Sequence, residues 1–115
     1  MPRPLNLPPP IEPGNCVLYA RYVRNYMLPA GPGLAFGLST LKGKMNVIDS
    51  NGRKPRVGSV AVMYNSLDPS VGHVAVVYKV AGDVVYLTEA NYGGPQVRYD
   101  RHMLYNDKQI YGYLY

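Results

Sequence analysis

The stretch from residue 72 to residue 91, GHVAVVYKVAGDVVYLTEAN, decides the fold because it predicts a central β-hairpin. Apolar residues occupy both faces of residues 72–80, which is typical of a strand in the middle of a sheet. Residues 81–83, Ala-Gly-Asp, predict the loop, and residues 84–90 predict the returning strand. A loop of this length pairs Val80 with Val84.

The register of this hairpin determines which polar side chains can meet. A three-residue loop places His73 opposite Asn91 and makes Glu89 a diagonal neighbour of His73, with about 7–8 Å between the backbones. All three side chains then share one face at one end of the hairpin. A two-residue loop would shift the pairing by one residue and turn Glu89 to the opposite face. The predicted grouping therefore depends on the register.

Upstream of the hairpin, residues 16–27 predict a helix that begins after Asn15, a good N-cap residue. One apolar face contains Cys16, Ala20, Val23 and Met27, and a second contains Leu18, Tyr19, Tyr22 and Tyr26. Because two faces are apolar, we expect the helix to be largely buried, with Arg21 and Arg24 at its solvent edge.

The remaining segments complete an α+β domain, in which the N-terminal helix packs on an antiparallel meander. Further strands are predicted at residues 60–64, 97–99 and 110–115, a short helix at residues 34–41, and a polar turn region at residues 49–59. Residues 1–13 hold six of the 11 prolines and predict an extended arm. Residues 14–115 are expected to form a single domain.

The composition limits the possible chemistry and location of the chain. A length of 115 residues suits one domain, and the single cysteine, Cys16, excludes an intrachain disulfide and a cysteine zinc cluster. No apolar run reaches the roughly 18 residues of a membrane helix, and the proline-rich start lacks the apolar core of a secretory signal. We therefore expect no stable membrane insertion, and delivery of the chain by some other component.

The net charge of +5 favours a polyanionic partner, such as nucleic acid, anionic lipid or an acidic cell-wall polymer. The basic residues are scattered, however, and the densest group, at residues 53–56, matches no nucleic-acid-binding module. Nucleic acid is therefore not the expected partner, although a small nucleic-acid-binding protein remains a rival hypothesis.

Three polar positions of the predicted hairpin and one of the helix could form a cysteine-dependent active site. Cys16 in the first helical turn would have its thiolate favoured by the helix dipole and by free N–H groups. His73 would act as base, and Glu89 or Asn91 would orient its ring. Each residue also has a structural interpretation: a small buried hydrophobe, a packed histidine, an exposed carboxylate and a turn residue.

Four segments resemble, in order, the sequence blocks of the CHAP family, the cysteine- and histidine-dependent amidohydrolases/peptidases. They are GNCVLYA at residues 14–20, VGSVAV at residues 57–62, GHVAVV at residues 72–77 and EANY at residues 89–92. The resemblance implies a compact papain-like fold, with Cys16 as nucleophile, His73 as base, and Glu89 and Asn91 as their acidic and amide partners. Leu18 departs from the pattern, since an aromatic residue often stands there.

The resemblance also implies a substrate and a setting. Members usually cleave peptidoglycan, at the muramoyl–alanine amide or within the stem and cross-bridge peptides, and many come from bacteriophages. We therefore expect a monomeric amidase or endopeptidase, either an endolysin that passes from the host cytoplasm to the wall through a lysis pore or a component of the virion. The rival within the family is a catalytically silent module that binds the wall or serves a structural role.

Three other residues are candidates for a supporting role. Asn15 could help to hold the oxyanion, and Tyr19 and Tyr92 flank the proposed residues and could line a substrate groove. Some family members bind calcium through an aspartate-rich loop near the cysteine. Here residues 8–15 contain only one acidic residue, Glu12, so no metal cofactor is expected.

Overall fold

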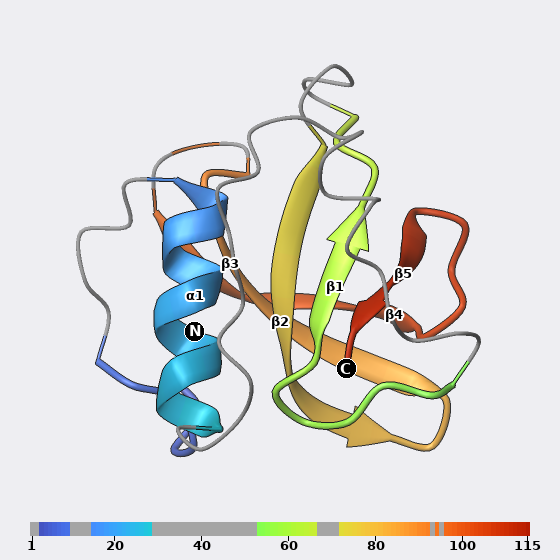
Figure 1. The fold of residues 1–115 in the computed structure, drawn as a ribbon, viewed down its shortest axis with the longest axis horizontal. Coiled ribbons are helices and arrows are strands. Elements are labelled where there is room, and N and C mark those ends of the chain that lie inside the picture. The colour runs from blue at the N-terminus through green and yellow to red at the C-terminus, as the bar shows by residue number, and fades with distance from the viewer. Residues whose placement is uncertain (1–2, 10–14, 29–52, 67–71, 93, 95) are drawn as a thin grey trace.

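The structure is a computed structural model, and it describes residues 3–9, 15–28, 53–66, 72–92, 94 and 96–115 (Figure 1). Its elements are the helix α1 (Cys16–Met27) and the strands β1 (Val60–Met63), β2 (His73–Ala81), β3 (Val84–Ala90), β4 (Val97–Leu104) and β5 (Ile110–Leu114). The strands form one antiparallel sheet in the order β4-β3-β2-β1-β5. The predicted α+β fold is confirmed, and β5 closes the meander by returning to β1.

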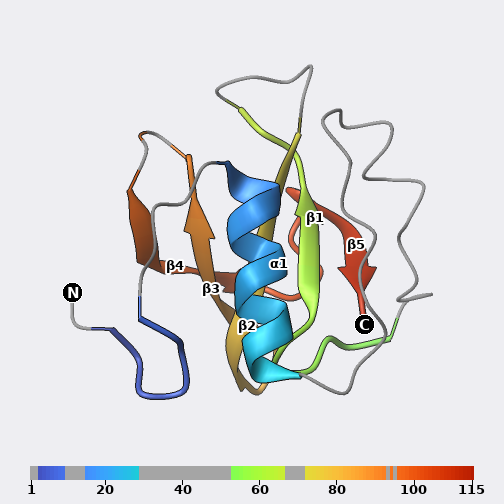
Figure 2. The same ribbon diagram turned by 60° about the vertical axis from the view of Figure 1, so that its left-hand side comes forward.

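Helix α1 covers one face of the sheet, where it packs against β2 and β3 (Figures 1 and 2). Its buried residues include Val17, Ala20 and Val23, which share an apolar cluster with Val74 and Val76 of β2. Burial of one such aliphatic side chain stabilises the fold by about 1.5–3 kcal/mol. The cluster therefore holds the start of α1, where Cys16 lies, in a fixed place relative to β2.

A second apolar cluster lies on the opposite face of the sheet. It contains Ala75 and Val77 of β2, Leu87 of β3 and Tyr113 of β5. The hydroxyl of Tyr113 donates a hydrogen bond of 2.6 Å to the carbonyl of Tyr105, which joins β5 to the segment after β4. Strand β2 is thus buried on both faces over most of its length, as predicted for a central strand.

The loop between β2 and β3 is shorter than predicted. Ala81 pairs with Val84, so the loop consists of Gly82 and Asp83 alone. Gly82 has a φ of 60°, the left-handed conformation that a tight two-residue turn requires. The predicted three-residue loop, with Val80 opposite Val84, is therefore wrong.

A β-bulge at Tyr78 compensates for the shorter loop. Near the loop, Lys79 pairs with Tyr86 in the register of a two-residue turn. Beyond Tyr78, which is an extra residue in β2, the pairs follow the register of a three-residue loop. The far end of the hairpin therefore has the predicted register, in which His73 and Glu89 face the same side.

Strand β4 is longer than the predicted segment 97–99 and continues to Leu104. His102, which lies beyond the predicted strand 97–99, is part of β4. Its ring stacks on that of Tyr86 in the neighbouring strand, with 5.3 Å between the centroids and 25° between the planes. The extra length of β4 brings one more charged residue toward the site described below.

Arg24 was expected at the solvent edge of α1, and this expectation is wrong. Its residue surface is only 2% exposed, and its Nη1 donates to the carbonyl oxygens of Gly58 (2.9 Å) and Tyr115 (3.2 Å). These carbonyls come from segments distant in the sequence. Helical periodicity could not indicate them, although a buried guanidinium requires such partners.

The described part of the N-terminal segment, residues 3–9, contains a turn rather than a fully extended arm. The N–H of Leu7 donates to the carbonyl of Pro4 (3.2 Å), and the Leu7 side chain is buried in the cluster under α1. The predicted helix at residues 34–41 and the start of the predicted turn region, residues 49–52, lie outside the described residues. Helix α1 is too short to span a membrane, and the described residues form no other candidate span.

Candidate active site

Cys16 is the first residue of α1, and Asn15 determines where the helix begins. The side-chain Oδ1 of Asn15 accepts a hydrogen bond of 2.9 Å from the N–H of Leu18, which confirms the predicted N-cap. Cys16 is partly exposed. Its thiol therefore lies at the positive end of the helix dipole and within reach of solvent, an environment that favours the thiolate.

His73 is the first residue of β2 and is fully buried. The preceding residue, Gly72, has a φ of 67°, a conformation that glycine adopts readily. The carbonyl of Gly72 accepts a hydrogen bond of 3.2 Å from Nδ2 of Asn65. This fixed turn sets the direction in which the imidazole leaves the strand.

Glu89 holds one side of the imidazole. Its Oε1 lies 2.8 Å from Nε2 of His73, and both side chains are almost completely buried. Burial raises the pKa of Glu89, but hydrogen bonds with His73 and Arg101 lower it more, so the net pKa is below its ordinary value. Because an ionised carboxylate can only accept, Nε2 of His73 carries a proton and donates it to this bond.

Cys16 interacts with the same imidazole. Since Nε2 is bonded to Glu89, the nitrogen left for the thiol is Nδ1, which is buried and has no partner at hydrogen-bond distance among the described residues. Burial lowers the pKa of His73, but the nearby Cys16 thiol and the bonded Glu89 carboxylate outweigh it and raise the pKa overall. A raised imidazole pKa favours an ion pair between imidazolium and thiolate.

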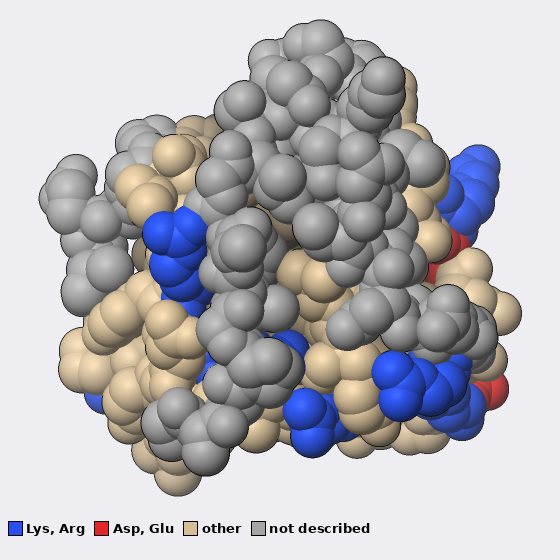
Figure 3. Space-filling model, viewed as in Figure 1, with Lys and Arg blue, Asp and Glu red and all other residues tan. Residues whose placement is uncertain are grey.

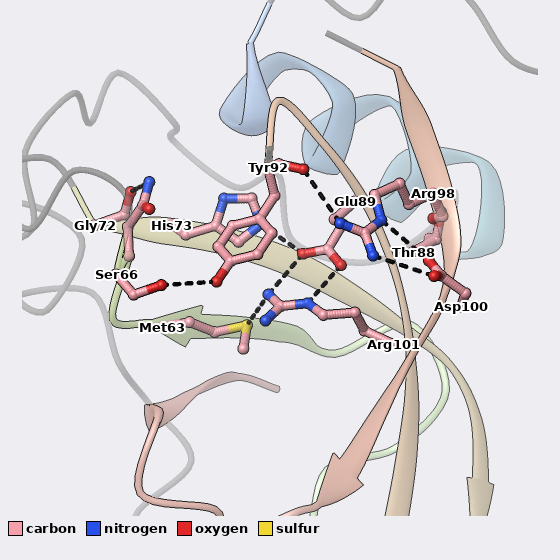
Figure 4. Close-up of polar contacts among 11 residues, drawn as sticks. Met63, Ser66, Gly72, His73, Thr88, Glu89, Tyr92, Arg98, Asp100 and Arg101 are labelled. Atoms are coloured by element: carbon pink, nitrogen blue, oxygen red, sulfur yellow. Dashed lines mark hydrogen bonds and ion pairs between the residues drawn. The ribbon is translucent and has the colours of Figure 1, made fainter. Parts of the chain in front are cut away.

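Asn91 follows β3 in a left-handed conformation with φ of 59°, which asparagine tolerates better than most residues. After this bend, the ring of Tyr92 lies 5.1 Å from the ring of His73, tilted by 49° (Figure 4). Of the two predicted orienting residues, Glu89 is the one bonded to Nε2 of His73. A role for Asn91 in the reaction stays a prediction.

Arg101 of β4 completes the site and was not predicted from the sequence. Its Nε lies 2.7 Å from Oε2 of Glu89, and its Nη2 lies 2.8 Å from Oε1. Figure 4 shows the Glu89 carboxylate between Arg101 and the ring of His73. Burial of the Glu89 carboxylate could have indicated such a residue, because a buried carboxylate needs a cationic partner. However, the predicted strand 97–99 ended before Arg101.

The three supporting candidates have different outcomes. Tyr19 lies in the core, 2% exposed, with its hydroxyl 2.7 Å from that of Thr88, and burial raises its pKa to about 12. Tyr19 therefore ties α1 to β3 and does not line a groove. Tyr92 is partly exposed beside His73, where a substrate could touch it. The oxyanion role of Asn15 stays a prediction: its Oδ1 accepts the helix-cap bond, and only its Nδ2 could donate to an oxyanion.

Within the ranges that the structure describes, no group of three or more His, Cys, Asp or Glu side chains could hold a metal ion. Residues 10–14, the middle of the segment considered for calcium, lie outside those ranges. The absence of a calcium site there stays a prediction.

The sequence and the geometry agree with one known family. The family model for the CHAP domain matches residues 9–91, which is more than half of the chain and includes Cys16, His73, Glu89 and Asn91. The chain belongs to the CHAP family. No curated protein matches its sequence.

Two solved structures share the fold of this CHAP domain. The crystal structure of Ly7917 has a TM-score of 0.62 and 17% identity, and the match covers 87% of this chain and 52% of that one. The crystal structure of Ly7917 with the hydrolyzing product of MDP has a TM-score of 0.59 and 18% identity, with the same coverage. The chain therefore spans about half the length of these proteins, and the likeness confirms the papain-like α+β fold.

Proposed function

We propose that this CHAP domain is a peptidoglycan hydrolase that cleaves an amide bond with Cys16 as nucleophile. The observation that carries the proposal is the buried hydrogen bond between Nε2 of His73 and Glu89, which leaves Nδ1 of the same ring for Cys16 at the start of α1. The membership in a family of cysteine- and histidine-dependent amidohydrolases supports it. So does the structure of Ly7917, which holds the hydrolyzing product of MDP.

In the proposed reaction, the Cys16 thiolate attacks the carbonyl carbon of the substrate amide. His73 gives its Nδ1 proton to the leaving nitrogen as the C–N bond breaks, which leaves a thioester on Cys16. Water then attacks the thioester, and Nδ1 of His73 takes one proton from it. Breakage of the C–S bond releases the carboxylic acid and restores the ion pair.

The negative oxygen of each tetrahedral intermediate needs hydrogen-bond donors. The first turn of α1 offers backbone N–H groups that have no partner within the helix, and Cys16 lies in that turn. Donors held in place before the reaction stabilise the developing charge without reorganisation. We assign the oxyanion site to this turn, and the side-chain amide of Asn15 could supply a further donor.

The chemical test is to digest purified peptidoglycan and identify the products by mass spectrometry. An amidase is expected to expose new free amines on alanine, and an endopeptidase is expected to split the stem or the cross-bridge. Protein alkylated at Cys16, its only cysteine, is the matched control and is expected to leave the polymer intact. Peptidoglycan unchanged by the untreated protein would contradict the proposal and favour a catalytically silent wall-binding module.

The setting that we propose is a bacteriophage lysin. A net charge of +5 suits an enzyme that approaches an anionic wall, and Figure 3 shows basic side chains in several separate groups on one face, with few acidic ones. Produced in a bacterial cytoplasm, the chain is expected to lyse cells only when a phage pore-forming protein is produced with it. Measurement of culture turbidity tests this, and lysis without the pore would contradict the setting.

A further inference from the structure

The contacts of Arg101 point to a role beyond structural support. Glu89 is fully buried, and both of its carboxylate oxygens accept hydrogen bonds from Arg101. Oε1 accepts from Nη2 of Arg101 and from Nε2 of His73, each at 2.8 Å. Two fixed bonds from a planar guanidinium determine the orientation of the carboxylate, and hence where it meets the imidazole.

Arg101 is itself held by residues from two other segments. Its guanidinium carbon lies 3.9 Å from the centroid of the Tyr92 ring, and its Nη2 lies 3.9 Å from Sδ of Met63 in β1. The side chain is only 15% exposed. Because the Tyr92 ring also packs beside His73, one aromatic ring contacts both groups that bind Glu89 (Figure 4).

We propose that Arg101 is a positioning residue that keeps Glu89 ionised and aimed at Nε2 of His73, and thereby sets the pH above which Cys16 is reactive. The proposal rests on the proposed function where it is tested by enzyme kinetics. Its test by alkylation of Cys16 does not depend on that function. Arg101 acts through Glu89 and His73 and does not touch the reacting bond.

The direction of the effect follows from the charged and titratable groups around Glu89. They are His73 from β2, with Cys16 of α1 beyond it, Tyr92 after β3, and Arg98 and Arg101 from β4. Arg101 is the cation bonded to both carboxylate oxygens. Without it, burial would favour the protonated carboxyl, the imidazolium would lose its anionic partner, and the thiolate would lose the imidazolium.

Arg98 supplies a matched control on the same strand. It also binds a carboxylate with two bonds, from Nε and Nη2 to Asp100, each at 3.1 Å. That pair is more exposed, with side-chain exposures of 29% and 53%. Arg98→Met therefore removes a similar ion pair from β4 without removing a bond to Glu89.

The experiment compares Arg101→Met, Arg101→Lys and Arg98→Met with the unmodified protein, using two measurements. The first is the pH dependence of kcat/KM, and the second is the pH dependence of Cys16 alkylation by iodoacetamide, which needs no substrate. In Arg101→Met we expect the acid limb of both curves to move up by about 1 pH unit, and kcat/KM at its plateau to fall about tenfold or more. Arg98→Met is expected to shift both curves by much less than Arg101→Met, because Arg98 acts on Glu89 through its charge and makes no bond to the carboxylate.

Arg101→Lys restores the charge but not the two-bond geometry. It is expected to return the acid limb close to its original pH while the plateau of kcat/KM stays several-fold lower. If Arg101→Met does not fold, the plateau value of kcat/KM in Arg101→Lys is the test of the proposal. An unchanged alkylation curve in folded Arg101→Met, or an unaltered plateau in Arg101→Lys, overturns the proposal. A shifted alkylation curve in a protein that does not cleave peptidoglycan supports the role of Arg101 and rejects only the proposed substrate.

Discussion

Replacement of Cys16 with alanine is expected to lower kcat/KM on peptidoglycan by on the order of 10⁴-fold or more, because no other group can form the acyl intermediate. Cys16 is the only cysteine in the chain, so no second thiol can replace it. The rate is measured by the release of soluble fragments from purified walls. The remaining rate would be that of water attack assisted by the oxyanion site alone.

The same substitution should leave the fold intact. Cys16 is partly exposed at the start of α1, and the N-cap bond from Leu18 to Asn15 does not involve its side chain. We expect the free energy of unfolding to change by less than about 1 kcal/mol, which thermal or denaturant unfolding can measure. A folded Cys16→Ala variant with full activity would show that another residue is the nucleophile, and the proposed mechanism would be wrong.

Signals carried by neighbouring residues predicted most of the scaffold. The N-cap at Asn15 and the spacing of apolar residues located α1 at residues 16–27, as observed. Alternation and turn residues located four strands within one residue at each end, but underestimated β4. These features depend on backbone geometry over a few residues, which a single sequence reveals directly.

The hairpin register shows the limit of such signals. The predicted loop was one residue too long, and the bulge at Tyr78 restored the register at the end where His73 and Glu89 lie. Nothing in the local sequence marks Tyr78 as a bulge. Its position reflects pairing on both sides of β2, so the correct grouping of His73 with Glu89 was reached through an incorrect loop.

Buried arginines were missed for a similar reason. Arg24 was expected at the solvent edge of its helix and Arg101 lay beyond the predicted strand 97–99, yet both are largely buried. Their partners are Gly58 and Tyr115 for the first and Glu89 for the second. The position of a long cationic side chain depends on hydrogen-bond acceptors that the whole fold brings together. These acceptors are not neighbours in the sequence.

Substitution of His73 is expected to have the second large effect, and it separates the nucleophile from the group that activates it. In His73→Ala, kcat/KM on peptidoglycan should fall by on the order of 10³-fold or more. The variant has no base to accept the thiol proton and no acid to protonate the leaving nitrogen. The pKa of His73 is raised, so the imidazolium persists to a higher pH than in a free histidine and stabilises the thiolate. Its removal should therefore raise the pKa of the Cys16 thiol toward the ordinary value of about 8.5.

The pH dependence of iodoacetamide alkylation measures that change directly. We expect half-maximal alkylation well below about pH 8.5 in the unmodified protein, and near it in His73→Ala. His102→Ala is the matched control. This second histidine lies in β4, is exposed and stacks on Tyr86, whereas His73 is buried and hydrogen-bonded to Glu89. Identical alkylation curves for the unmodified protein and His73→Ala would mean that the imidazole does not hold the thiol proton. Cys16 would then owe its reactivity to the start of α1 alone, and the roles assigned to Glu89 and Arg101 would fail with that of His73.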